Sequence, residues 1–187
     1  MIADNFKDAV LSMMESIAEN IPDIHKSSPV KAYLTGGAAI HFYTQMRVSD
    51  DVDVILSNNV QIPQDLVVLW LNKEGNIEQI AYDYNYTPTL GILHEDYEDR
   101  ATLVKTIDGK FQIYVLHPID LIISKLVRYA ANDEADIKAM VEHGYIDKQR
   151  LTELADDAIN VGVGFNPKHV RLHLEWVLEM FNNENTQ

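Results

Sequence analysis

The sequence predicts an α+β fold, in which a mixed β-sheet flanked by helices is followed by a C-terminal helical region. Before Pro118, short apolar runs alternate with turn residues, a pattern typical of strands. From Pro118 onward, apolar residues recur at helical spacing. A glycine pair, Gly36 and Gly37, stands where the first strand should meet a helix. We therefore expect an α/β core over residues 1–117 and a helical region over residues 118–187 that packs on it.

The first half of this core begins with an amphipathic helix over residues 4–20. Its apolar side chains fall on one stripe of the helix because they recur every three or four residues. They are Phe6, Val10, Met13, Met14 and Ile17. The elements expected after it are a strand over residues 30–35, a helix over 37–46 and a strand over 51–57.

The second half of the core is expected to be strand-rich. Its elements are a hairpin with strands over residues 66–70 and 77–83, a loop with a short helical turn over 86–100, and two strands over 101–106 and 111–116. The pair Asp108-Gly109 between the last two strands is a strong turn signal. In the helical region, Pro118 suits a first helical residue and Gly144 suits a C-cap.

Two acidic residues on the expected strand over 51–57 suggest a metal site. Side chains alternate across a strand, so Asp51 and Asp53 should share one face while the neighbouring valines point into a core. Two carboxylates held side by side repel each other unless a cation lies between them. Carboxylate oxygens suit Mg²⁺ or Mn²⁺, and Mg²⁺ usually combines one or two protein carboxylates with substrate phosphates.

The glycine pair suggests a phosphate site next to that metal site. Gly36 and Gly37 allow the backbone to approach a ligand closely, and a helix that begins there directs its N–H groups toward anions. A phosphate site beside a metal site is the arrangement that nucleotide chemistry requires. We therefore expect Gly36 and Gly37 to contact the phosphates of a nucleotide.

The order of these residues resembles the signature of the DNA polymerase β-like nucleotidyltransferase superfamily: a strand, Gly-Gly, a helix, and Asp-x-Asp on the next strand. Arg47-x-Ser49-x-Asp51-x-Asp53 is also similar to the Arg-x-Thr-x-Asp-x-Asp run of AbiEii-like toxin nucleotidyltransferases, with serine in place of threonine. The resemblance implies the nucleotidyltransferase fold and a metal-dependent enzyme that transfers a nucleoside monophosphate from an NTP. Asp51 and Asp53 would be catalytic and would hold the metal.

The same superfamily usually adds a third carboxylate from a neighbouring strand, and Asp83 is our choice for it. Asp83 ends the run Ile80–Asp83, where an acid at the rim of a sheet can reach a metal without complete desolvation. The alternative is a turn residue whose carboxylate accepts local backbone N–H bonds. Ser49, which we place in the nucleotide site, either orients Asp51 through a hydrogen bond or simply begins the strand.

The helical region contains a second set of charged residues, Lys125, Arg128, Asp133 and Asp136. Their spacing is similar to a segment of AbiEii-like proteins. The stretches from Tyr86 to Tyr97 and from Pro118 to Arg128 are closer still to a family of uncharacterised bacterial nucleotidyltransferase-fold proteins. The resemblance implies that Lys125 faces the nucleotide and Asp136 helps to position it, while Arg128 could clamp phosphate. The alternative is a set of interhelical salt bridges, with Asp133 favouring a helix N-terminus.

Composition limits the classes of function. The formal net charge of −14 argues against broad binding to long DNA or RNA, although a nucleotide or a folded RNA end remains compatible with it. The absence of cysteine excludes disulfides, thiolate metal ligands and a cysteine nucleophile. No apolar run reaches the length of a membrane span, and the acidic start lacks the basic region of a signal peptide. A cytoplasmic location is expected.

Two functions of different classes follow. The first is a transferase that uses an NTP and an acceptor that the sequence does not identify, such as a tRNA or other RNA end, a protein or a small molecule. The second is an interaction module with little or no catalysis, for example one component of a toxin–antitoxin pair with a cognate antitoxin or regulator. The acidic surface and the lack of a recognisable acceptor-binding domain motivate the second.

Overall fold

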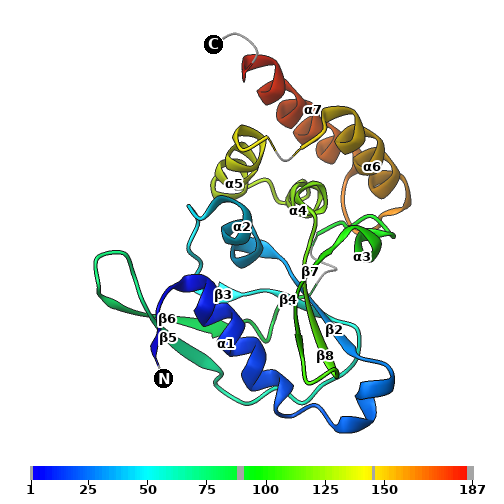
Figure 1. The fold of residues 1–187 in the computed structure, drawn as a ribbon. Helices are drawn as coiled ribbons and strands as arrows, with labels where there is room; N and C mark the ends of the chain where they lie inside the picture. The colour runs from blue at the N-terminus through cyan, green and yellow to red at the C-terminus, as the bar shows by residue number, and fades with distance from the viewer. Residues whose placement is uncertain (1, 88–90, 145, 185–187) are drawn as a thin grey trace. The chain divides into compact units, whose positions relative to one another are not determined.

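The computed structural model describes residues 2–87, 91–144 and 146–184 (Figure 1). The described chain divides into two compact units. One contains the residues up to Tyr86 together with Ala101–Leu116, and the other contains Thr87–Arg100 together with the residues from His117 onward. The loop expected over 86–100 therefore falls in the second unit except for Tyr86, and its residues 88–90 lie outside the described part of the chain.

The first unit contains two mixed β-sheets of four strands each. The first sheet has the strand order β1–β5–β6–β3, with β1 Ile2–Ala3, β5 Val67–Leu71, β6 Ile77–Tyr82 and β3 Asp51–Val52. The second sheet has the order β4–β2–β8–β7, with β4 Val54–Leu56, β2 Val30–Leu34, β8 Phe111–Val115 and β7 Thr102–Ile107. Within the described residues, α1 (Phe6–Ala18), a 3-10 helix (Asp23–Ser27) and α2 (Gly36–Thr44) complete this unit.

Helix α1 packs against the first sheet and provides much of the core of this unit (Figure 1). The helix begins where the Asn5 side chain accepts a hydrogen bond from the backbone N–H of Asp8 at 3.0 Å, as an N-cap does. The stripe predicted from the sequence is buried: Phe6 is 1% exposed, and Met13 and Ile17 are 0% exposed. On the sheet, Ile80 and Trp70 are buried on the side that α1 covers.

Strand β2 lies in the interior of the second sheet and leads directly to α2. It runs parallel to β8 and antiparallel to β4, so its backbone groups are bonded on both sides. Four of its five side chains are buried on both faces of the strand, and Lys31 is the partly exposed one. This arrangement gives the Gly36–Gly37 turn at the end of β2 a rigid base.

The strand predicted over residues 51–57 differs from the structure, which has two short strands in different sheets. Asp51–Val52 pairs with β6, whereas Val54–Leu56 pairs with β2. The physical reason is that successive backbone carbonyls meet different partners. The carbonyl of Val52 accepts from the N–H of Asp83 at 3.2 Å, and that of Asp53 accepts from Thr35 at 3.0 Å.

The second unit is helical within its described residues. Its helices are α3 Tyr97–Arg100, α4 Pro118–Lys125, α5 Ala131–Glu142, α6 Lys148–Val161 and α7 Pro167–Glu184. Pro118 is the first residue of α4, as predicted, and the His117 ring nitrogen Nδ1 accepts from the N–H of Ile119. Arg100 forms a bidentate ion pair with the fully buried Asp120.

These elements confirm the predicted α+β class, with mixed sheets flanked by helices and a helical C-terminal region. Seven α-helices occur among the described residues. None of the helices in the described ranges combines the length and the apolar character needed to cross a membrane.

Replacing Ile80 by alanine should remove buried packing between β6 and α1. We expect Ile80→Ala to lower the free energy of unfolding by roughly 2–5 kcal/mol because Ile80 is fully buried. Ile77→Ala is the matched control on the same strand, since Ile77 is 59% exposed and should change stability by less than about 0.5 kcal/mol. Urea unfolding of both variants measures the difference. Equal losses would show that the two faces of β6 are assigned wrongly.

Candidate active site

Three carboxylates from two segments of the first unit, residues 51–53 and Asp83, meet at one place. Asp51, Asp53 and Asp83 each offer one oxygen atom, and these atoms all lie within 4.8 Å of one another. Asp51 belongs to β3, Asp53 lies between β3 and β4, and Asp83 directly follows β6. Asp51 is exposed and the other two are partly buried. We call these three residues the acid cluster.

Backbone hydrogen bonds hold the acid cluster to both sheets. The N–H of Asp83 donates to the carbonyl of Val52, which fixes Asp83 beside β3. The N–H of Thr35 donates to the carbonyl of Asp53, which fixes Asp53 beside the end of β2. Because Val52 and Thr35 are almost fully buried, these bonds are shielded from water. The backbone hydrogen bonds of the two sheets therefore fix the positions of Asp53 and Asp83.

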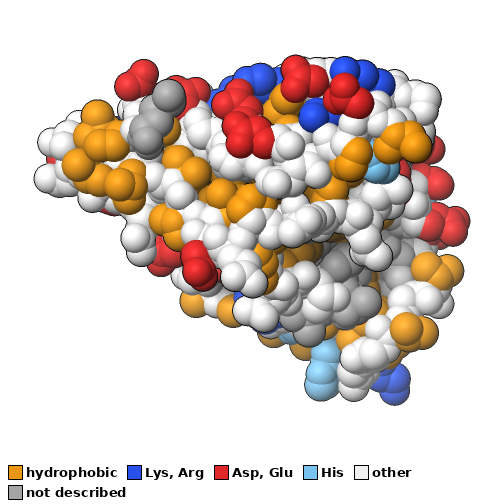
Figure 2. Space-filling view, turned by 90° about the horizontal axis from the view of Figure 1, so that it is seen from below, with side chains coloured by type: hydrophobic (Ala, Val, Ile, Leu, Met, Phe, Trp, Pro, Cys, Tyr) orange, Lys and Arg blue, Asp and Glu red, His pale blue; other side chains and the backbone are white. Residues whose placement is uncertain are grey.

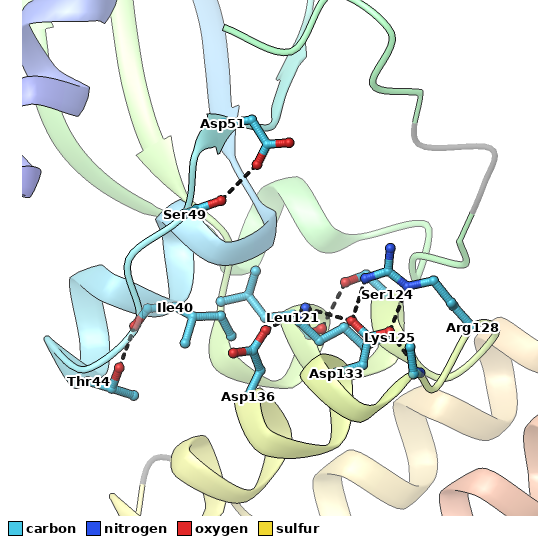
Figure 3. Close-up of polar contacts among 11 residues, drawn as sticks. Ile40, Thr44, Ser49, Asp51, Leu121, Ser124, Lys125, Arg128, Asp133 and Asp136 are labelled. Atoms are coloured by element: carbon cyan, nitrogen blue, oxygen red, sulfur yellow. Dashed lines mark hydrogen bonds and ion pairs between the residues drawn. The ribbon is translucent and has the colours of Figure 1, made fainter. Parts of the chain in front are cut away.

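Ser49 orients the first acid of the cluster. Its hydroxyl donates a hydrogen bond to Oδ1 of Asp51 at 2.7 Å (Figure 3). Of the two interpretations of Ser49 left open by the sequence, the structure shows the hydrogen bond. The side chain is buried, so the Asp51 carboxylate has a fixed donor on one of its oxygens.

The glycine pair packs directly against this cluster. Gly36 has φ +58°, and a Cβ added to it would lie 1.8 Å from Oδ2 of Asp53. A Cβ on Gly37 would lie 3.0 Å from Cβ of Ser49 and 3.2 Å from Nε of Arg47. Glycine at position 36 is thus required both by the backbone conformation and by the space that the Asp53 carboxylate occupies. This carboxylate lies against the first turn of α2.

Helix α2 starts without a side-chain cap and is tied to the next segment through His41. Thr35 is the N-cap residue of α2, but its side chain makes no capping hydrogen bond. Burial lowers the pKa of His41, so the ring is neutral at physiological pH. Its Nδ1 lies 2.6 Å from the carbonyl of Arg47, which can only accept, so Nδ1 donates. The sequence offered no signal for this contact, because His41 is one of seven scattered histidines.

Asp83 makes the turn bond of one interpretation and also lies near the other two acids, while its role as a metal ligand stays a prediction. Its Oδ1 accepts a hydrogen bond from the N–H of Asn85 at 2.8 Å, as a turn residue does. A carboxyl oxygen of the same residue also lies within the acid cluster. A carboxylate has about four acceptor sites on two oxygens, so the turn bond leaves capacity for a cation.

The charged residues of the helical region form an ion-pair network in the second unit, in which Lys125, Asp133 and Asp136 are buried and Arg128 is exposed (Figure 3). Nζ of Lys125 lies 3.0 Å from Oδ1 of Asp133 and 2.9 Å from Oδ2 of Asp136. The Arg128 guanidinium contacts both oxygens of Asp133, each at 2.7 Å. The structure therefore shows the salt bridges of the alternative interpretation. A role of Lys125, Arg128 and Asp136 in nucleotide binding stays a prediction.

Asp133 is the centre of this network. Its Oδ2 also accepts from the N–H of Ala130 at 3.0 Å, which closes the N-terminus of α5. Burial acts to raise the pKa of Asp133, but the hydrogen bonds from Arg128 and the charge of Lys125 outweigh it and lower the pKa to about 2. Asp133 therefore stabilises the start of α5 as a charged residue.

The acid cluster has the donor set of a site for a hard divalent cation. Its ligands are carboxylate oxygens, which suit Mg²⁺ and Mn²⁺, and the chain has no cysteine to favour a softer metal. Three negative charges within 4.8 Å repel one another, and a divalent cation would offset that repulsion. The residues of the acid cluster therefore fit a divalent cation, which is what the sequence motif implies.

The comparisons with known proteins gave one family and a structural neighbour. The family model described as "Nucleotidyltransferase of unknown function (DUF6036)" matches residues 11–184. Among solved structures, the chain is similar to an antigenic nucleotidyltransferase-like protein from Paracoccidioides brasiliensis. The two share 11% identity with a TM-score of 0.49, over 99% of this chain and 93% of that one. No curated protein matches the chain.

Gly36→Ala should destabilise the protein more than alanine at another glycine with positive φ. The added Cβ would overlap Asp53, so we expect about 1–3 kcal/mol of loss beyond the backbone strain. Gly75→Ala is the control, because Gly75 has φ +81° with nothing within 4 Å and shows the strain alone, about 1–2 kcal/mol. Chemical denaturation gives both values. Similar losses would mean that Asp53 is not held against α2.

Asp133→Asn should remove a stabilising charge whose effect depends on pH. The folded-state pKa of about 2 lies below the usual 3.8, so this contribution is present above about pH 4 and is lost as the pH falls toward 2. The difference in unfolding free energy between wild type and Asp133→Asn should thus be large at pH 7 and shrink below pH 4.

Urea unfolding at several pH values measures this difference. Glu142→Gln is the control, because Glu142 forms an exposed pair with Lys138 on the same helix and its removal should leave stability nearly unchanged. A difference for Asp133→Asn that does not vary between pH 7 and pH 3 would contradict the charged network.

Proposed function

The chain belongs to the family of nucleotidyltransferases of unknown function, and we propose that it is a metal-dependent enzyme that transfers a nucleoside monophosphate from an NTP to an acceptor. The observation that carries this proposal is the acid cluster, in which three carboxylates from two segments of the chain lie within 4.8 Å of one another. The fixed position of Ser49 and the contact of Gly36 with Asp53 support it, because both hold the acids in place.

The proposed reaction is a displacement at the α-phosphorus of the NTP. The acceptor oxygen forms a bond to this phosphorus, the bond to the β-phosphate oxygen breaks, and pyrophosphate leaves with the bonding electrons. A divalent cation held by Asp51, Asp53 and Asp83 would neutralise phosphate charge and favour the deprotonated acceptor oxygen. Asp83, at the rim of the first sheet, takes the proton that the acceptor loses. The Ser49 hydroxyl keeps the Asp51 carboxylate oriented during this step.

The rest of the nucleotide site is proposed from the start of α2 and from the second unit. Backbone N–H groups of Gly36 and Gly37 hold the β- and γ-phosphates, where no side chain caps the helix. The sequence resemblance adds Lys125, Arg128 and Asp136 of the second unit as nucleotide-binding residues, and within that unit both cations are paired with acids.

Finer parts of the proposal come from the sequence motifs. Mg²⁺ or Mn²⁺ is the cation, an NTP is the substrate, and the cytoplasm is the setting. The similarity of Arg47–Asp53 to AbiEii-like toxins adds a cognate antitoxin as a regulatory partner. The acceptor is an RNA end, a protein or a small molecule, which the acid cluster alone does not distinguish.

Asp51→Asn combined with Asp53→Asn should abolish nucleotide transfer. We expect label transfer from α-labelled NTPs, with Mg²⁺ or Mn²⁺ and either total tRNA or cell lysate, to fall by about 100-fold or more. Asp50→Asn is the control, because it removes one negative charge at an exposed neighbour outside the acid cluster, and this variant should transfer normally. Transfer that survives the double substitution would remove these residues from the mechanism. No transfer by wild type to any acceptor would favour an interaction module.

A further inference from the structure

Asp51 lies on one face of the first sheet, and this face extends from β3 across β6 to β5. Asp51 is paired with Ala81 across the β3–β6 ladder, and Ala81 is paired with Val67 across the β6–β5 ladder. Paired residues on neighbouring strands direct their side chains to the same side of a sheet. Leu69 and Ile77 share this side because they lie at alternate positions of the same strands. We call this side the open face.

The open face is apolar and accessible. The opposite face is covered by α1 and contains buried residues such as Ile80 and Trp70. The exposed apolar side chains of the open face are Ile2 at 43%, Val67 at 44%, Leu69 at 41%, Leu71 at 36% and Ile77 at 59%. Figure 2 shows hydrophobic side chains gathered at its left end, where the β5–β6 hairpin projects in Figure 1. Contiguous exposed apolar side chains are typical of an interaction site.

The charge of the open face distinguishes between classes of partner. Among the described, paired residues of β1, β3, β5 and β6 that point to this side, none is lysine or arginine. The polar ones are Gln79 and Asp51. A nucleic-acid acceptor needs cationic side chains along its phosphates, and the chain has a net charge of −14. An apolar polypeptide that is neutral or basic matches both the surface and the charge.

The distance along this face suits a short peptide segment. Neighbouring strands lie about 4.8 Å apart, so Val67 is about 10 Å from Asp51 across two strand spacings. An extended segment covers about 10 Å with three residues. A polypeptide whose apolar side chains rest on Val67 and Leu69 therefore brings a residue three or four positions away to the acid cluster.

We propose that the open face is the docking surface for the acceptor, and that this acceptor is an extended, apolar segment of another protein with a serine, threonine or tyrosine hydroxyl. This inference rests on the proposed nucleotidyltransferase function. The hydroxyl oxygen bonds to the α-phosphorus, pyrophosphate leaves with the electrons of the broken bond, and the hydroxyl proton passes to Asp83. The product is a protein that carries a nucleoside monophosphate through a phosphodiester bond.

Binding of an unfolded polypeptide tests the surface without requiring activity. The probe is reduced, carboxamidomethylated lysozyme with a fluorescent label, measured by anisotropy and in competition with total tRNA. Leu69→Lys should weaken binding at least tenfold. Leu103→Lys is the control, because Leu103 lies on β7 of the second sheet, is 49% exposed and receives the same charge. Equal effects of the two variants, or tRNA that displaces the polypeptide from the Leu69 site, would overturn the proposal.

A second copy of the chain is the other occupant that the experiment must exclude. Sedimentation of wild type and Leu69→Lys over a range of concentrations detects it. We expect both to behave alike. A wild-type dimer that dissociates in Leu69→Lys would assign the open face to self-association and overturn the proposal.

Label transfer separates this inference from the proposed function. With α-labelled NTP and a divalent cation, wild type should label the lysozyme chain and not tRNA, and Leu69→Lys should lose most of this labelling. Asp53→Asn should retain polypeptide binding and lose labelling. Polypeptide binding that depends on Leu69 without labelling of any acceptor would remove the proposed function and leave a docking surface. Labelling of tRNA alone would keep the function and overturn the protein acceptor.

Discussion

Mutual repulsion among three carboxylates is the constraint around which the first unit is organised. Asp51, Asp53 and Asp83 are held within 4.8 Å of one another, an arrangement that costs free energy unless a cation offsets it. Each is restrained: Asp53 and Asp83 by backbone hydrogen bonds, and Asp51 by the Ser49 hydroxyl. In the proposed function this preorganisation favours binding of a cation and a triphosphate, because the positions of the acids are already set before either binds.

In the second unit, buried carboxylates are neutralised by the side chains of basic residues. There Asp133 and Asp136 lie against Lys125 and Arg128, so that each carboxylate has an opposite charge within ion-pair distance. Removing Lys125 would leave two buried carboxylates without that opposite charge, so this network contributes to holding α4 to α5. Acidic residues near one another in the sequence thus occur in two different electrostatic settings in this chain. The spacing of the acids does not distinguish the candidate metal site from the structural network. The distinguishing feature of the network is that lysine and arginine side chains lie within ion-pair distance of its acids.

The sequence was sufficient for much of the fold and for the acid cluster. The Gly36–Gly37 turn, the Asp51/Asp53 pair and a strand that ends at Asp83 were predicted from local pattern and turn chemistry, and β6 ends one residue earlier. The division of residues 51–57 between two sheets was not predicted, because Val52 and Val54 alternate as they would in a single strand. Which sheet each joins depends on hydrogen bonds from Asp83 and Thr35, distant in sequence. The open face could not be predicted from the sequence either. Val67–Leu71 is apolar at every position, so no alternation of polar and apolar residues showed which side of the strand is covered.

The central claim is that the acid cluster holds a divalent cation, and Mn²⁺ binding followed by electron paramagnetic resonance tests it most directly. Bound Mn²⁺ loses the sharp signal of the free ion, so the affinity of wild type and of single variants can be compared without any acceptor. The account predicts saturable binding by wild type that ATP tightens and that Asp53→Asn weakens at least tenfold. Mn²⁺ binding of the same strength in wild type and Asp53→Asn would contradict it.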